Sequence, residues 1–130
     1  MSSIKLNPTI TRFLPALIWM GLIFFFSSIP DLSLHGQLSV YDFVLRKLAH
    51  ITEYAILTIC YYYALPNMQT KKRLLLSAVI SIVYATTDEF HQSFVYRRTG
   101  HLSDVAIDSI GVLISLVLIK SVHAKKAHRS

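Results

Sequence analysis

The sequence predicts an all-α membrane protein in which four transmembrane helices form one bundle, and three observations support this fold class. First, 53% of the 130 residues are hydrophobic and 15% are charged, whereas a soluble domain carries about 25% charged residues. Second, the mean hydropathy is +0.48. Third, the charged residues fall between apolar runs, and a chain of this length has room for about four spans of ~20 residues. We therefore expect residues 1–130 to form a single membrane domain.

The four expected spans lie at about residues 13–30, 48–65, 74–94 and 102–122. The first run carries no charge, and the sequence around Ser27 and Ser28 fits a signal-peptide cleavage site poorly, so an uncleaved helix is favoured. The second run ends at Pro66. In the third and fourth runs the uncharged part is too short to cross a membrane, so both spans must include acidic residues.

The distribution of Lys and Arg predicts the orientation of the bundle. With four spans, both termini lie on one side, and that side holds nine basic residues near the span ends, whereas the other side holds four. The positive-inside rule therefore places both termini in the cytoplasm. All seven acidic residues then lie in the outer half: Asp31, Asp42, Glu53, Asp88, Glu89, Asp104 and Asp108.

Polar side chains form a stripe at the outer end of each of the last three spans. The stripes consist of Lys47, His50, Glu53 and Tyr54 on the second span, Asp88, His91 and Gln92 on the third with Glu89 to one side, and Asp104, Asp108, Gly111 and Ser115 on the fourth. Ionisable groups at membrane depth usually face the interior of a bundle and mark functional sites. Gly111 and Ser115 have the small-xxx-small spacing that lets helices approach closely. We expect the stripes to face one another around a polar pocket.

These residues resemble the VanZ-like family of small bacterial membrane proteins, which is named for a factor that raises resistance to the glycopeptide teicoplanin. The resemblance covers roughly residues 10–122 and is carried by Lys47-x-x-His50-x-x-Glu53-Tyr54, by the block from Thr87 to Phe94, by Arg98, and by Ser103-Asp104, Asp108 and Gly111. Family members often carry Asn where Asp108 stands. The resemblance implies a multi-pass protein of the bacterial plasma membrane with a role in the cell envelope or in antibiotic resistance.

The candidate ligand-binding residues are Lys47, His50, Glu53, Tyr54, Asp88, Glu89, His91, Gln92, Arg98, Ser103, Asp104 and Asp108. Within this set, Glu53, Asp88, Glu89 and His91 are the candidates for acid–base catalysis. Arg98 at a pocket rim suits a phosphate or another anionic head group.

Three functions fit this constellation. The first is binding or modification of an amphiphile on the outer leaflet, such as a lipid-linked envelope precursor or a lipoglycopeptide. The second is a membrane-embedded metal-dependent enzyme, with His50, Glu53, Asp88 and His91 as candidate ligands at the i, i+3 spacing of bundle metal sites. The third is an ion or proton pathway. We expect contact with membrane lipids, no nucleic-acid partner and no cofactor, with a divalent metal as the alternative.

Overall fold

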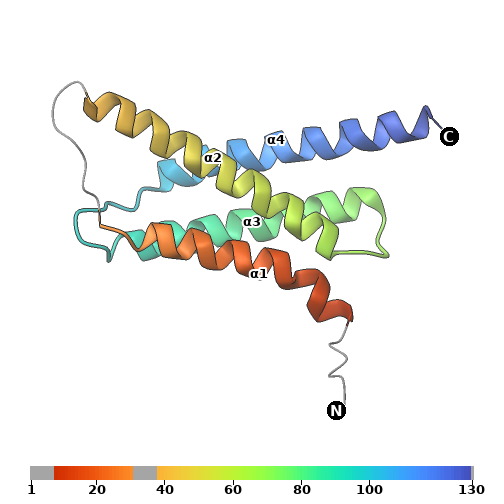
Figure 1. Cartoon of the computed structure of the whole chain (residues 1–130), viewed down its shortest axis with the longest axis horizontal. Helices are drawn as coiled ribbons and strands as arrows, with labels where there is room; N and C mark the ends of the chain where they lie inside the picture. Colours follow the sequence, from red (N-terminus) through yellow and green to blue (C-terminus); the bar gives the residue numbers. More distant parts are fainter. Residues whose placement is uncertain (1–7, 31–37, 130) are drawn as a thin grey trace, which may run out of the picture.

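The computed structural model describes residues 8–30 and 38–129, which form four α-helices packed together (Figure 1). The helices are α1 (Pro8–Ser27), α2 (Leu38–Ala64), α3 (Thr70–Gln92) and α4 (Leu102–Ala127). Successive helices run in opposite directions, so the start of α1 and the end of α4 lie at the same end of the molecule as the α2–α3 connection (Figure 1). The α3–α4 connection lies at the opposite end, which we call the polar end. The prediction of an all-α chain with four packed helices is confirmed.

The exterior of the bundle carries many large hydrophobic side chains, and its interior includes polar ones. Large hydrophobic side chains point outward from every helix, for example Phe25 (61% exposed), Leu75 (64%) and Val117 (63%). Fully buried positions include the hydroxyl-bearing residues Thr58, Ser77, Ser81 and Ser115. Soluble proteins rarely expose large contiguous apolar surfaces, whereas helix interfaces in membranes are rich in small and hydroxyl-bearing residues. This distribution of side chains is typical of a membrane protein.

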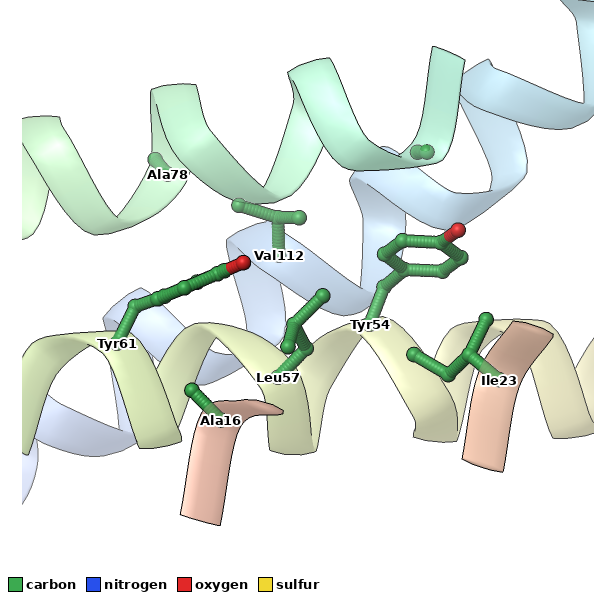
Figure 2. Close-up of a cluster of buried hydrophobic side chains, with 8 residues drawn as sticks. Ala16, Ile23, Tyr54, Leu57, Tyr61, Ala78 and Val112 are labelled. Atoms are coloured by element: carbon green, nitrogen blue, oxygen red, sulfur yellow. The ribbon is translucent and has the colours of Figure 1, made fainter. Parts of the chain in front are cut away.

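Helix α2 contacts each of the other three helices and forms the centre of the bundle. Its Tyr54, Leu57 and Tyr61 belong to the main hydrophobic cluster, to which α1, α3 and α4 contribute (Figure 2). Val112 is the contribution of α4 to this cluster. The cluster lies next to the polar end, toward the middle of the bundle, and fixes the relative positions of the four helices.

Gly111 of α4 makes a close contact with α2. A Cβ atom at this position would collide with the carbonyl oxygen of Ile51 on α2, so the two backbones are in direct contact. Gly111 lies about one turn after Asp108, and Ile51 follows His50 directly. The absence of a side chain at Gly111 therefore lets α4 bring its acidic residues onto the polar stripe of α2.

All four helices extend beyond one end of the segments expected to span. Helix α2 begins at Leu38, ten residues before the expected span, and so contains Arg46 and Lys47 within its helical part. Helix α4 continues to Ala127, where the His123 ring lies 2.9 Å from the Tyr62 hydroxyl. The length of a charge-free run in the sequence is therefore a poor guide to the length of the helix. A helix can continue through charged residues when their side chains are paired, as Lys47 of α2 is with Asp104.

Within the described residues, two helices are long and apolar enough to cross a membrane by length and composition, Ile10–Ser27 and Leu102–Ala127. This differs from the expectation of four such segments. The reason lies in the composition of the other two helices: α2 carries Asp42, Arg46, Lys47 and Glu53, and α3 carries three basic residues at its start and two acidic residues near its end.

The contact at Gly111 leads to a first prediction. Gly111→Ala forces α4 away from α2, and overpacking of this kind costs about 1–3 kcal/mol. We expect the free energy of unfolding in mixed detergent micelles, measured by titration with SDS, to fall by that amount. The matched control is Gly21→Ala on α1, where a Cβ meets no atom of the described residues within 4 Å. Equal stability of the two variants would contradict the proposed role of Gly111.

Candidate functional site

One ion pair and one histidine–carboxylate contact join α2 to α4 at the polar end. The Lys47 ammonium donates to Asp104 with Nζ and Oδ1 2.6 Å apart, and His50 Nδ1 lies 3.0 Å from Asp108 Oδ1. Lys47 and His50 are one turn apart on α2, and Asp104 and Asp108 are one turn apart on α4. Both contacts can form because α2 and α4 run in the same direction (Figure 1). Asp108 is completely buried, whereas the Lys47 and Asp104 side chains retain about a fifth of their surface. The stripes of α2 and α4 therefore face each other.

Helix α3 contributes a chain of hydrogen bonds that ends at Arg98. The Gln92 amide donates to Asp88 Oδ2 at 2.9 Å, and the Arg98 guanidinium donates to Gln92 Oε1 at 3.2 Å. Both Asp88 and Gln92 are buried. Gln92 thereby fixes the orientation of the carboxylate and of the guanidinium together.

Arg98 also holds the end of α1. Its Nε donates to the carbonyl of Ile29 at 2.8 Å, and its Nη2 donates to the carbonyl of Phe26 at 3.2 Å. Three of the five N–H groups of the guanidinium are thus used within the protein, leaving two for a ligand. Arg98, which was expected at the rim of the pocket, therefore also holds the end of α1 in place, and we call this role the clamp.

Glu89 is held by the turn between α3 and α4. The backbone N–H of His101 donates to Glu89 Oε2 at 3.2 Å. Gly100 makes this possible, because a Cβ there would collide with the carbonyl oxygen of Glu89. The turn therefore packs directly on α3 and fixes the Glu89 side chain, which is 3% exposed.

His91 lies away from the other candidate residues. Its ring stacks on Phe24 of α1 with ring centroids 4.4 Å apart, and its Nε2 lies 3.0 Å from Ser28 Oγ. The four residues suggested as metal ligands, His50, Glu53, Asp88 and His91, are therefore not brought together. In place of that set, ligand atoms of His50, Glu89 and Asp108 lie within 4.8 Å of one another.

Two adjoining cavities open between the helices at the polar end. The larger, of about 490 Å³, is lined by Phe43, Arg46, Lys47, His50, Gln92, Arg98, Thr99, His101, Ser103, Asp104 and Ile107. The smaller, of about 360 Å³, is lined by Phe26, Ser27, Ile29, Arg46, Ala49, His50, Glu53, Asp88, Gln92 and Arg98. Four residues line both: Arg46, His50, Gln92 and Arg98. The cavities thus form one site with two compartments.

Tyr54 of the expected set lies below the cavities. Its side chain is completely buried and packs against Tyr84 with ring centroids 6.4 Å apart. The lining residues that the sequence analysis did not single out include Arg46, Ser27 and Ile29. Arg46 precedes His50 by four residues and Glu53 by seven, so helical spacing alone would have identified it.

Three of the buried hydroxyl groups in the middle of the bundle donate within their own helices, and Thr58 Oγ1 also lies 2.9 Å from Ser81 Oγ of α3. Thr58, Ser77 and Ser115 each donate to a carbonyl oxygen three or four residues earlier. A proton relay requires groups that pass hydrogen bonds onward along the bundle, and among these hydroxyl groups only the Thr58–Ser81 contact joins two helices. This arrangement does not favour the ion or proton pathway.

The fold and the site define a small helical bundle with many apolar side chains on its exterior and two cavities at one polar end. The sequence matches the VanZ/LLP1 family over residues 12–123. The chain therefore belongs to this family of membrane proteins, which confirms the resemblance. Comparisons with curated proteins and with solved structures each gave no match.

The dual role of Arg98 leads to a second prediction. Hydrogen bonds to charged groups contribute about 1.5–3 kcal/mol each, so Arg98→Ala should weaken the attachment of α1 and lower thermal stability in detergent by several degrees. Arg98→Lys should restore only part of this loss, because an ammonium cannot reproduce the planar fork of donors. The control is Arg97→Ala, since the neighbouring Arg97 is exposed. Comparable losses in the Arg97 and Arg98 variants would exclude the clamp.

Proposed function

We propose that this protein is a four-span protein of the bacterial plasma membrane that binds the acidic head group of an amphiphile at its outer face. Both termini lie in the cytoplasm, and the polar end opens toward the outer leaflet. The ligand is a lipid-linked envelope precursor, and its binding lowers susceptibility to lipoglycopeptides such as teicoplanin. Family membership and the apolar exterior of all four helices support a role in the membrane.

The observation that carries the proposal is the group of cationic side chains around the larger cavity, Arg46, Lys47 and Arg98. Lys47 uses one of its three N–H donors on Asp104, and Arg98 retains two N–H groups after its contacts within the protein. Charge-assisted hydrogen bonds from such groups are the usual means of binding phosphate and carboxylate. A cavity of about 490 Å³ is of the size of small-molecule binding sites.

The smaller cavity supports a head group that also carries hydroxyl groups. It is lined by Asp88 and Ser27, and among the described residues Asp88 Oδ1 and Ser27 Oγ have no hydrogen-bond partner. A buried polar atom that lacks a partner costs about 1–3 kcal/mol. Hydroxyl donors of a sugar would supply the missing hydrogen bonds next to a phosphate held in the larger cavity.

Apolar side chains at the cavity mouths provide a path for the hydrocarbon part. Phe43 borders the larger cavity, and Phe26 and Ile29 border the smaller one. Each of these side chains is exposed on the surface of the bundle. An amphiphile can therefore place its head group in the site while its chain remains in the bilayer.

Binding of a polyprenyl diphosphate by the purified protein tests the proposal. We expect the diphosphate to bind more tightly than the uncharged polyprenol in native mass spectrometry and fluorescence titration. Lys47→Gln with Asp104→Asn removes both charges of the pair without leaving one unpaired, and should weaken binding roughly tenfold while the protein stays folded. The same double variant should lose the protection against teicoplanin that the wild-type chain confers on a susceptible host.

The control for this experiment is Lys71→Gln with Lys72→Gln, which removes two exposed charges at the other end of the bundle. It should leave diphosphate binding and protection unchanged. Equal binding of the diphosphate and the alcohol would refute recognition of the head group. Protection that depends on Lys47 without any lipid binding would indicate direct capture of the lipoglycopeptide.

The orientation is tested by labelling cysteines in a Cys60→Ala background. Thr99→Cys at the polar end should react with a membrane-impermeant maleimide in intact cells or spheroplasts. Gln69→Cys, in the α2–α3 connection, should react only after the membrane is broken. Labelling of Gln69→Cys alone would place the site on the cytoplasmic side.

A further inference from the structure

A cluster of His50, Glu89 and Asp108 lies between α2, α3 and α4, and the amphiphile-binding proposal does not use Glu89 or Asp108. One candidate ligand atom from each residue lies within 4.8 Å of the other two. Glu89 is 3% exposed and Asp108 is 0% exposed. Three helices therefore direct one nitrogen and two carboxylates toward the same buried point.

Each of the two carboxylates is held through one oxygen while its other oxygen remains unused. Asp108 Oδ1 contacts the His50 ring and Glu89 Oε2 accepts from the His101 backbone. Within residues 8–30 and 38–129, Asp108 Oδ2 and Glu89 Oε1 are buried without a hydrogen-bond partner. Two buried carboxylate oxygens without partners next to an imidazole point to a ligand that accepts electron pairs.

The charge balance of this region also calls for a cation. Asp88, Glu89 and Asp108 are all buried, and their contacts are the Gln92 amide, the His101 backbone N–H and the His50 ring respectively. The Gln92 and His101 donors are neutral, and the His50 ring is charged only when it is protonated, a form that cannot bind a metal. Removing an ion from water costs several kcal/mol even after relaxation of the protein, so a carboxyl group at this depth binds either a proton or a cation.

We propose that His50, Glu89 and Asp108 bind a divalent transition-metal ion of the Zn²⁺ class. One nitrogen and two carboxylate oxygens form a mixed donor set of the kind used by Zn²⁺, Mn²⁺ and Fe²⁺, whereas Mg²⁺ and Ca²⁺ prefer oxygen alone. Metal-to-ligand distances of about 2.0–2.2 Å put neighbouring ligands about 3.3 Å apart. The His50 and Asp108 atoms are already 3.0 Å apart, and a candidate ligand atom of Glu89 lies within 4.8 Å of a candidate atom of each of them.

The surroundings of the cluster favour this ion over a lysine or arginine partner. The charge of Lys47 is matched by Asp104 at 2.6 Å, and Arg98 is directed toward carbonyl groups of α1 and toward Gln92. Three protein ligands leave coordination positions for water or for an oxygen of a bound molecule. His50 also lines both cavities, so such a molecule would reach the ion from the site above.

Metal binding by the full-length protein tests this site, with the ion alone as the probe. The protein is purified in detergent through a tag without histidines, stripped with EDTA and titrated with Zn²⁺. We expect about one Zn²⁺ per chain and an increase in thermal stability on binding. Titration with Co²⁺ should give visible absorption bands of a four- or five-coordinate ion.

The variants distinguish this site from background binding by other histidines. Glu89→Gln preserves an oxygen that can accept from the His101 N–H but removes the anionic ligand, and it should weaken Zn²⁺ binding roughly tenfold or more. Asp108→Asn should behave similarly. His91→Gln, which alters a histidine of the same bundle that faces α1, should bind Zn²⁺ like the wild type.

The proposal is overturned if the wild-type chain binds no stoichiometric Zn²⁺, or if Glu89→Gln and Asp108→Asn bind it with unchanged affinity. Size-exclusion chromatography and the thermal stability of the stripped protein show that each variant is folded. Because no amphiphile is present, the result is independent of the proposed function: a chain that binds the metal but not the diphosphate would retain this site and lose the other.

Discussion

The contact between the backbones of α2 and α4 at Ile51 and Gly111 is the constraint on which the polar end of this bundle depends. Any side chain at Gly111 would hold the helices apart. Because His50 and Asp108 lie beside this contact in their helices, a wider separation would break the 3.0 Å pair between them. The contact thus connects a packing property of small residues to the geometry of a charged site.

The interior of the bundle combines two demands that oppose each other. Close packing in lipid is provided by small residues such as Ser77, Ser81 and Ser115, which allow helices to approach but bury little apolar area. Three buried carboxylates add a destabilising charge at one end. The structure meets this cost with hydrogen bonds that cross between helices and connections, above all those of Arg98 and of the Gly100–His101 turn. A cluster of buried carboxylates lowers the stability of the bundle, so its presence indicates that the function requires it.

Much of this arrangement was predictable from the sequence, because the polar stripes of α2 and α4 follow helical periodicity. The stripe of α3 was predicted less well. Successive residues are rotated by about 100° around a helix, so His91 and Gln92 lie on opposite sides of Asp88. Gln92 and Glu89 share the side toward the site, whereas His91 reaches α1. Periodicity defines which residues share a face, but it cannot decide which neighbouring helix that face meets.

The role of Arg98 shows a second limit of sequence-based prediction. A basic residue next to a pocket motif indicates a ligand contact, and Arg98 does line both cavities. Its hydrogen bonds to Phe26 and Ile29 depend on how α1 ends, about 70 residues earlier in the chain. Such long-range contacts leave no local pattern. The same holds for Glu89, whose partner at His101 is set by the path of a turn.

Trp19 gives the molecule an intrinsic optical probe. It is the single tryptophan of the chain, and its indole N–H donates to the backbone carbonyl of Glu53 at 2.8 Å, directly beneath the smaller cavity. Indole emission depends on local polarity and hydrogen bonding, so its wavelength will follow the docking of α1 onto α2. Changes at the floor of the site can therefore be observed in an unlabelled protein, in detergent or in a bilayer, without altering a single residue.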